Sequence, residues 1–185
     1  MDKRTGLKKL GKILKDVGGP EHYLFNLEDI APVFPELTKP ALKMLLGRAV
    51  SDGLLQRVCR NIYIDPDRIV TRGTILYRIA AKLRAGSLNY VSLESVLSDA
   101  GVISQVPFQW LTLMSSGRSS LIDCGQWGTI EFVHTDKEHA RLANVLVYDE
   151  TIRFWRAPVA LAIREMKACH RPLDLIDWRI ADEFV

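Results

Sequence analysis

The amino-acid sequence predicts a protein of the α+β class with two domains, and three observations lead to this prediction. The 185 residues, 48% of them apolar, suffice for one good hydrophobic core or two small ones. Helical periodicity dominates residues 4–53, and short alternating segments follow it. A charged stretch with a proline and a glycine then separates two halves, so we expect domains at 1–66 and 74–185 with a linker over 67–73.

The first predicted helix covers residues 4–17 and has two distinct stripes. The apolar stripe consists of Leu7, Leu10, Leu14 and Val17. The basic stripe, on another face, consists of Lys8, Lys12 and Lys15. Taken alone, such a stripe fits a solvated surface as well as a polyanion-binding one.

Two more helices are expected before residue 54. Asn26 precedes a short helix with Glu28 and Asp29 in its first turn, and Pro35 ends it. Thr38 caps the clearest helix of the chain, which Gly53 terminates. Its inward face consists of Leu42, Leu45, Leu46 and Ala49, and its outward face of Lys43, Met44, Gly47, Arg48 and Ser51.

A small basic hairpin follows this helix. The segments "GLLQRV" and "NIYID" alternate well enough to pair as antiparallel strands around a basic loop. Short helices followed by such a hairpin are typical of a winged helix-turn-helix, so we predict that residues 1–66 bind double-stranded DNA. The predicted contact residues are Lys8, Lys12 and Lys15 on phosphate, Thr38, Lys39, Lys43, Met44, Gly47 and Arg48 from the recognition helix, and Arg57, Arg60 and Asn61 from the wing.

The charge distribution supports this assignment. Residues 1–66 hold 11 Lys and Arg against 8 Asp and Glu, whereas the remaining residues hold 14 of each kind. The whole net charge of +3 therefore lies in the first third of the chain, which indicates a local surface for a polyanion.

The pattern of the second half of the chain predicts helices on either side, in sequence, of a β region. A helix over 74–86 precedes a short strand at Tyr90 and Val91, and Ser92 caps a helix that Gly101 ends. From Phe108 the pattern is β, in the segments "QWLTLMSS", "SSLIDC" and "GTIEFVHT", with a possible final pair at 145–148 and 152–155. Pro158 opens a helix to about Cys169, and an amphipathic helix with Leu173, Ile176 and Ile180 inward is expected after Pro172.

Several classes of protein are not indicated. No run approaches the roughly 18 apolar residues of a membrane span, and the N-terminus lacks a secretory apolar region, so we expect a cytoplasmic protein with no membrane partner. Cys59, Cys124 and Cys169 lie far apart without a CxxC pair, which predicts neither disulfides nor zinc. Phosphate-loop, dinucleotide-binding and hydrolase motifs are absent, so we expect no enzyme and no cofactor.

Two weaker readings of the second half remain open. Asp123 and Glu131 resemble the paired acids of metal-dependent nucleases, but Val133 stands where such sites usually carry a lysine. The segment "SGRSS" at 116–120 has the composition of a phosphate loop, although a hairpin turn between two strands is the simpler interpretation.

The stretches "LNYVSLESVLSDAGVISQVP", "TLMSSGRSS" and "GTIEFVHT" resemble the hallmark region of AbiEi-type antitoxins of type IV toxin–antitoxin, or abortive-infection, systems. The stretches "LEDIAPVFPEL", "ALKMLLGRAVSDGLLQRV" and "RNIYI" resemble the winged helix of that family, so the likeness covers nearly the whole chain. One departure is Asn61, where such wings commonly carry glycine. Asparagine also tolerates a positive φ angle.

The resemblance implies a winged helix followed by a mixed α+β antitoxin domain. It also implies a transcriptional autorepressor that binds inverted repeats in its own promoter and counteracts a nucleotidyltransferase-like toxin, without a stable complex being required. The main alternative is a winged-helix interaction module that binds its toxin directly, with DNA binding incidental.

Overall fold

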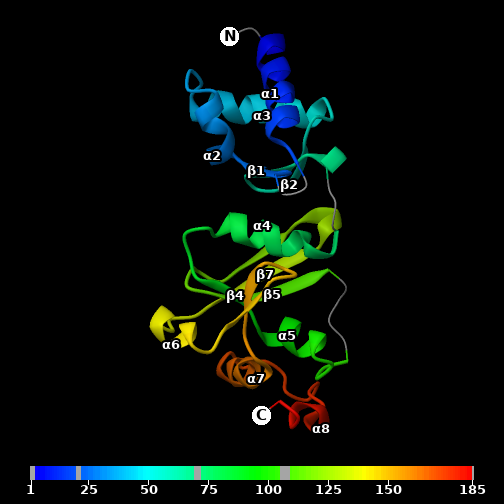
Figure 1. Ribbon diagram of the computed structural model, residues 1–185, viewed down its shortest axis with the longest axis vertical. Helices are drawn as coiled ribbons and strands as arrows, with labels where there is room; N and C mark the ends of the chain where they lie inside the picture. Colours follow the sequence, from blue (N-terminus) through cyan, green and yellow to red (C-terminus); the bar gives the residue numbers. More distant parts are fainter. Residues whose placement is uncertain (1–2, 20–21, 69–71, 105–108, 185) are drawn as a thin grey trace. The chain divides into compact units, whose positions relative to one another are not determined.

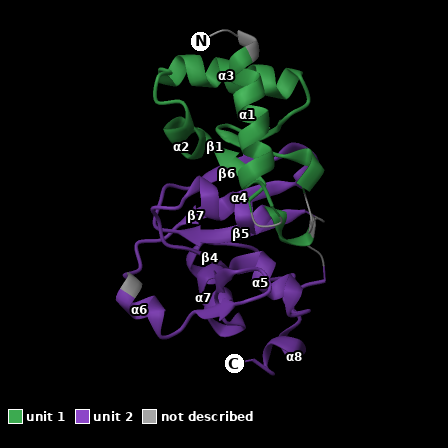
Figure 2. Cartoon of the chain, turned by 45° about the horizontal axis from the view of Figure 1, so that its top comes forward, with its two compact units in different colours: residues 1–75 green, residues 76–185 purple. Residues whose placement is uncertain are grey.

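The computed structural model describes residues 3–19, 22–68, 72–104 and 109–184. The chain divides into two compact units, residues 1–75 and residues 76–185, which Figure 2 colours separately. Both units combine helices with a β-sheet, which confirms the α+β class.

Unit 1 begins with the helices that the sequence predicts. Helix α1 covers Lys3–Val17, α2 covers Leu27–Ile30 and continues into a 3₁₀ turn over Ala31–Val33, and α3 covers Lys39–Ser51. Asn26 and Asp29 form a reciprocal capping box at α2, with N···O distances of 2.7 and 2.8 Å. Gly53 follows α3 with φ of 76°, the left-handed conformation that ends a helix.

A three-stranded sheet closes unit 1. Strands β2 (Gln56–Cys59) and β3 (Ile62–Ile64) form the predicted hairpin, with an irregularity between Arg57 and Cys59. Strand β1 (Leu24–Asn26) pairs with β3 in antiparallel register, so the strand order is β1-β3-β2. The sequence analysis did not predict β1, because three residues are too few to show an alternating pattern.

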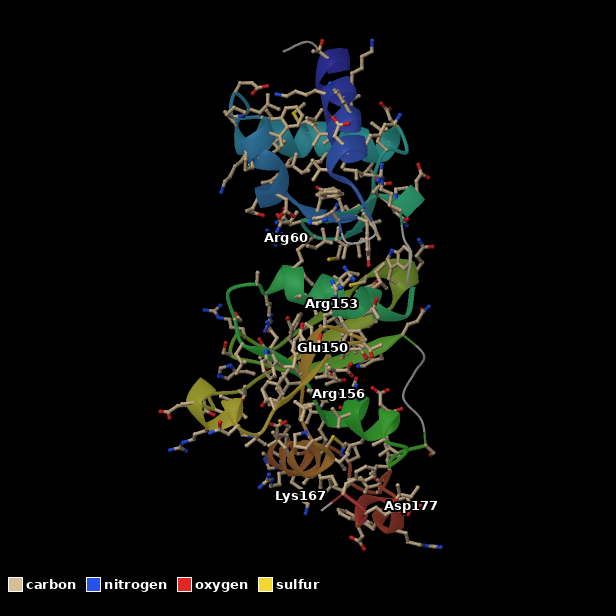
Figure 3. All side chains as sticks on the ribbon, in the orientation of Figure 1. Arg60, Glu150, Arg153, Arg156, Lys167 and Asp177 are labelled. Atoms are coloured by element: carbon tan, nitrogen blue, oxygen red, sulfur yellow. The ribbon has the colours of Figure 1, made fainter. Side chains whose placement is uncertain are left out.

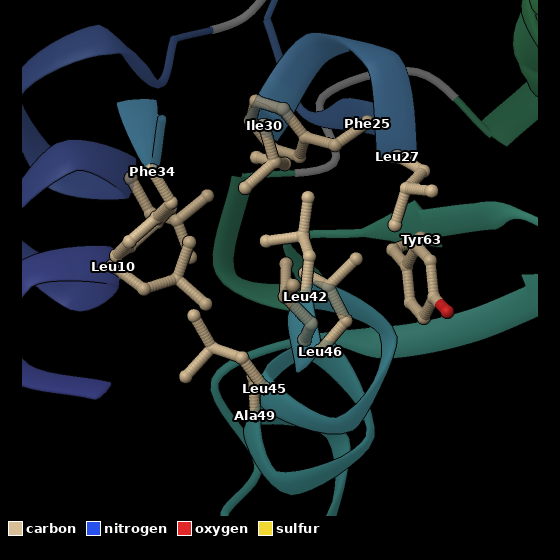
Figure 4. Packing of buried hydrophobic residues seen from close by; sticks show 12 residues of the cluster. Leu10, Phe25, Leu27, Ile30, Phe34, Leu42, Leu45, Leu46, Ala49 and Tyr63 are labelled. Atoms are coloured by element: carbon tan, nitrogen blue, oxygen red, sulfur yellow. The ribbon is translucent and has the colours of Figure 1, made fainter. Parts of the chain in front are cut away.

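The core of unit 1 lies among α1, α2, α3 and the hairpin. The inward leucines of α3 belong to one buried cluster with Leu10 and Leu14 of α1. Phe25, Phe34 and Tyr63 also belong to it, and Figure 4 labels them together with Leu10. Burying a Leu or Phe side chain contributes about 1.5–3 kcal/mol, so this packing fixes α3 and leaves its polar face outward.

The predicted linker starts with ordered structure. Residues Pro66–Arg68 and Arg72–Thr74 form 3₁₀ turns, and residues 69–71 lie outside the described residues. Arg68 donates to the carbonyl oxygen atoms of Gly18 and Lys15, the latter at 3.2 Å, and forms an ion pair with Asp65 at 3.3 Å. These contacts tie the beginning of this segment to the end of α1.

Unit 2 contains a mixed six-stranded sheet with the order β6-β7-β5-β4-β9-β8. Its strands are β4 (Asn89–Val91), β5 (Trp110–Ser115), β6 (Ser120–Asp123), β7 (Thr129–His134), β8 (Val147–Asp149) and β9 (Phe154–Arg156). The pairs β5–β7 and β4–β9 are parallel, and the remaining pairs are antiparallel.

Helices cover both faces of this sheet. Figure 1 shows α4 (Ile75–Leu83) on one face and α5 (Leu93–Asp99) with α7 (Val159–Ala168) on the other. Arg156 of β9, which Figure 3 labels, joins Asp99 at the end of α5 to Asp149 of β8, at 2.5 and 3.7 Å. The short helices α6 (His139–Ala143) and α8 (Trp178–Ala181) complete the unit.

A buried polar network joins α7 to the sheet. Glu165 is only 1% exposed, and its carboxylate accepts hydrogen bonds from Tyr90 Oη at 2.6 Å and Ser92 Oγ at 2.5 Å. Lys137 Nζ lies 2.6 Å from the same carboxylate. Ser92 stands at the N-cap of α5 as predicted, but its hydroxyl binds Glu165 and caps no helix amide.

Two predictions for unit 2 are wrong, and one helix was missed. The segment "SGRSS" is not a hairpin turn, because β5 and β6 do not pair with each other and β7 lies between them. The last helix is confined to Trp178–Ala181, and Ile176 instead forms an isolated bridge with Ile103. Helix α6 was not predicted. None of the described helices has the length and apolar character that crossing a bilayer requires.

Candidate nucleic-acid interface

Six of the twelve residues predicted to bind DNA line one hollow on unit 1. It lies between α3, the β2–β3 hairpin and the start of α2, and its volume is about 610 Å³. Predicted contact residues supply most of its lining: Lys39, Lys43, Gly47, Arg57, Arg60 and Asn61. The others are Leu27, Glu28, Val50 and Tyr63, none of which was predicted. Helix α3 and the β2–β3 hairpin therefore contribute to a single surface.

The outward face of α3 is free for contact. Lys43 is exposed, Met44 is 59% exposed, and Arg48 is half-buried. A Cβ atom at Gly47 would meet no other atom within 4 Å, so packing does not require glycine there. Glycine in a helix interior costs about 1 kcal/mol relative to alanine. Its place on the open face suits the close approach of another molecule to the backbone.

Thr38 has a structural role at the start of α3. Its Oγ1 accepts a hydrogen bond from the backbone N–H of Ala41 at 3.4 Å. Lys39 follows in the first turn and is exposed. Thr38 therefore positions the N-terminus of α3.

The hairpin presents two arginines in different ways. Arg60 is exposed in the turn (Figure 3), while Arg57 extends from β2 and its Nε donates to the carbonyl oxygen of Cys59 at 3.3 Å. Among the described residues, Arg57 and Arg60 form no ion pair with an acid. The same holds for Lys39, Lys43 and Arg48 on α3. Within the part of the chain that the structure describes, α3 and the hairpin thus hold five cationic side chains without a carboxylate partner, and four of them line the hollow.

Asn61 holds the turn against α2. Its φ is 64°, the left-handed value that the sequence allowed. Its Oδ1 accepts from the backbone N–H of Leu27 at 3.3 Å, and its Nδ2 donates to the Glu28 carboxylate at 3.0 Å. Both polar atoms of this side chain are engaged within the protein, so its role in the hollow is to position the β2–β3 turn.

The α1 lysines do not line this hollow. Lys8, Lys12 and Lys15 surround a separate concavity of about 500 Å³ together with Leu7, Gly11 and Leu54. The two concavities share no lining residue. The hollow gives no support to phosphate contacts by these lysines, and those contacts stay a prediction.

Asp123 and Glu131, the two acids that resemble those of metal-dependent nucleases, are engaged in other contacts. Glu131 forms an ion pair with Arg171, which also lies 3.4 Å from Glu94. Asp123 Oδ1 accepts from the backbone N–H of Gly125 at 2.7 Å. Among the described residues, no group of three or more His, Cys, Asp or Glu is arranged to hold a metal ion.

Oxygen atoms of the serine-rich segment 115–120 accept hydrogen bonds from Arg84 of the same unit. Arg84 donates to Ser115 Oγ at 2.7 Å, to Ser120 Oγ at 2.8 Å and to the carbonyl oxygen of Arg118. The guanidinium also lies over the Phe132 ring, 3.9 Å from its centroid. The loop is therefore held by a cation from inside the unit.

Comparison with models of known protein families finds no match for this chain, and none of the curated proteins compared with it matches either.

Proposed function

We propose that unit 1 is a winged helix-turn-helix domain that binds double-stranded DNA, with α3 as the recognition helix and the β2–β3 hairpin as the wing. The observation that carries the proposal is the single hollow in which α3 and the hairpin present lysines and arginines that form no ion pair with a described acid. Proteins bind DNA chiefly by neutralising phosphates with such side chains and releasing counterions.

The arrangement suggests a division of roles. Lys43, Gly47 and Arg48 lie on the outward face of α3, which a major groove admits, and side chains there can reach base edges. Arg57 and Arg60 extend from the hairpin, where a phosphate backbone or minor groove would lie. Lys39, in the first turn of α3, suits a phosphate contact.

The wider role that we propose is that of an autorepressor and antitoxin of a type IV toxin–antitoxin system. It rests on the resemblance of residues 88–107 and of the later strands to AbiEi-type antitoxins. In this proposal unit 1 represses the promoter of its own operon, and unit 2 counteracts a nucleotidyltransferase-like toxin.

The test is a mobility-shift titration of the full chain. The probes are the DNA upstream of its own gene and a scrambled duplex, each across a salt series. Arg57→Ala and Arg60→Ala should weaken binding to both probes and reduce the slope of log K against log salt by about 1 each. Lys43→Ala and Arg48→Ala should instead reduce the preference for the specific probe by about 1–3 kcal/mol.

Arg141→Ala is the matched control, since Arg141 is an exposed arginine of α6 in unit 2, paired with Glu138 at 3.6 Å. It should leave both affinities unchanged. Equal loss on both probes for all four unit 1 variants would refute the division of roles. No preference for the specific probe at any salt concentration would refute the repressor.

A further inference from the structure

A second concave surface, here called the α1 groove, runs along the first helix. Its lining consists of Leu7, Lys8, Gly11, Lys12, Lys15 and Leu54, and its volume is about 500 Å³. Leu54 comes from the turn that follows α3 and remains 36% exposed. The lining residues of α1 span 7–15, about two helical turns, so the groove has the length of a short helical segment.

Gly11 keeps the groove open. It lies in the middle of α1, where glycine costs about 1 kcal/mol of helix stability relative to alanine. A Cβ atom at this position would lie 3.9 Å from Leu54 Cδ2 and would meet no other atom within 4 Å. No packing constraint therefore demands glycine here, and any larger side chain would extend over Leu54 and fill the floor.

The rim of the groove is cationic and unpaired. Lys8, Lys12 and Lys15 are exposed, and no described acid forms an ion pair with their side chains. The neighbouring Lys9 behaves differently, because its Nζ lies 3.7 Å from Glu36 and 4.7 Å from the centre of the Phe34 ring. The lysines without a described acidic partner therefore lie on the side of α1 that lines the groove, whereas the paired Lys9 is not part of the lining.

The combination of floor and rim indicates the kind of partner. A phosphate backbone needs cations alone and gains nothing from an exposed leucine floor. An amphipathic helix uses both features, since its apolar side chains fill the floor and acidic flanks pair with the lysines. A second copy of the groove would bring lysine against lysine, so self-association through this face is disfavoured.

We propose that the α1 groove binds an acidic amphipathic helix of another protein. The α1 groove and the hollow between α3 and the hairpin share no lining residue, so the two ligands occupy different residues of unit 1. The proposal does not depend on DNA binding, and failure of the proposed function would leave it standing.

The experiment uses fluorescence anisotropy with the full chain and three labelled synthetic peptides of about 15 residues. The first carries leucines at i, i+4 and i+7 flanked by glutamates. The second replaces each glutamate by glutamine, and the third replaces each leucine by serine. The first peptide should bind about tenfold more tightly than the second at low salt, and the third should not bind.

Variants of the groove separate its floor from its rim. Gly11→Met fills the floor without removing a lysine and should weaken the acidic peptide about tenfold, while far-UV circular dichroism shows the helix retained. Lys8→Gln, Lys12→Gln and Lys15→Gln should each weaken it about two- to fivefold and reduce its salt dependence. Lys9→Gln is the matched control, since Lys9 lies on the same helix but outside the groove lining, and it should leave peptide binding unchanged.

Three results would overturn the proposal. The first is equal affinity for the glutamate and glutamine peptides, and the second is unchanged binding by Gly11→Met. The third is a Lys8, Lys12 and Lys15 triple glutamine variant that loses DNA affinity and salt slope but still binds the acidic peptide. That outcome would assign the lysines to phosphate.

Discussion

Replacing Asn61 should loosen the β2–β3 turn from α2, and two substitutions separate the causes. Asn61→Gly removes the side-chain hydrogen bonds to Leu27 and Glu28 but tolerates the φ of 64°. Asn61→Ala removes the same bonds but keeps a Cβ atom in the left-handed conformation, which asparagine tolerates better than alanine.

The structure sets the size of each effect. The bond to the Leu27 amide is long, at 3.3 Å, and the bond to the Glu28 carboxylate is exposed, at 3.0 Å, so each falls at the low end for its type. Together they contribute about 1–2 kcal/mol. The left-handed conformation costs alanine about 1–2 kcal/mol relative to glycine, so Asn61→Ala should destabilise unit 1 by about 1–2 kcal/mol more than Asn61→Gly.

Native-state hydrogen exchange is the suitable assay. All four tryptophans lie in unit 2, so their fluorescence does not report on unit 1. The Leu27 amide should lose protection in both variants, and the amides of β3 should report the larger loss of stability in Asn61→Ala. Equal destabilisation by the two variants, or full protection of Leu27 in Asn61→Gly, would refute this account of the turn.

Three further predictions concern single side chains. Burial and the Glu165 carboxylate raise the pKa of Tyr90 above its ordinary 10.0, so the stability that the neutral phenol contributes is present below pH 10 and is lost as the pH rises. Urea denaturation between about pH 8 and 11, followed by tryptophan fluorescence, should show a steeper loss for the wild type than for Tyr90→Phe; parallel curves would contradict this. Arg84→Lys should destabilise unit 2 by about 1–3 kcal/mol in thermal denaturation, because an ammonium group cannot replace the forked guanidinium that binds several loop oxygen atoms. An unchanged midpoint would show that the positive charge alone suffices. Thr38→Ala should lower the stability of unit 1 by about 0.5–1 kcal/mol, since the capping bond is long, and should reduce hydrogen-exchange protection of the first turn of α3. Thr38→Ser should restore that protection, and equal protection in all three proteins would show that the cap is irrelevant.

Helix boundaries were the most predictable part of the fold. Asn26 and Thr38 mark the starts of α2 and α3, and Gly53 marks the end of α3, because capping depends on groups within three or four residues of each other. The inward leucines of α3 were predictable for a similar reason, since an amphipathic stripe is written into consecutive turns.

Strand pairing was less predictable. The six strands of unit 2 lie near their expected positions, yet β7 inserts between β5 and β6 and turns an expected hairpin into a crossover. A strand pattern shows which residues alternate but not which other strand accepts their hydrogen bonds. The engagement of Arg84 with the loop between β5 and β6 likewise joins groups more than 30 residues apart.

The sequence by itself determined the basic residues of the candidate interface and the polar face of α3, and it allowed a positive φ at Asn61, all of which follow from local spacing and composition. Only the tertiary structure decided that Asn61 binds Glu28, that α3 and the hairpin share one hollow, and that the α1 lysines surround a different groove. The physical reason is that periodicity and capping act within a few residues, whereas the neighbours of a side chain depend on how the whole core packs.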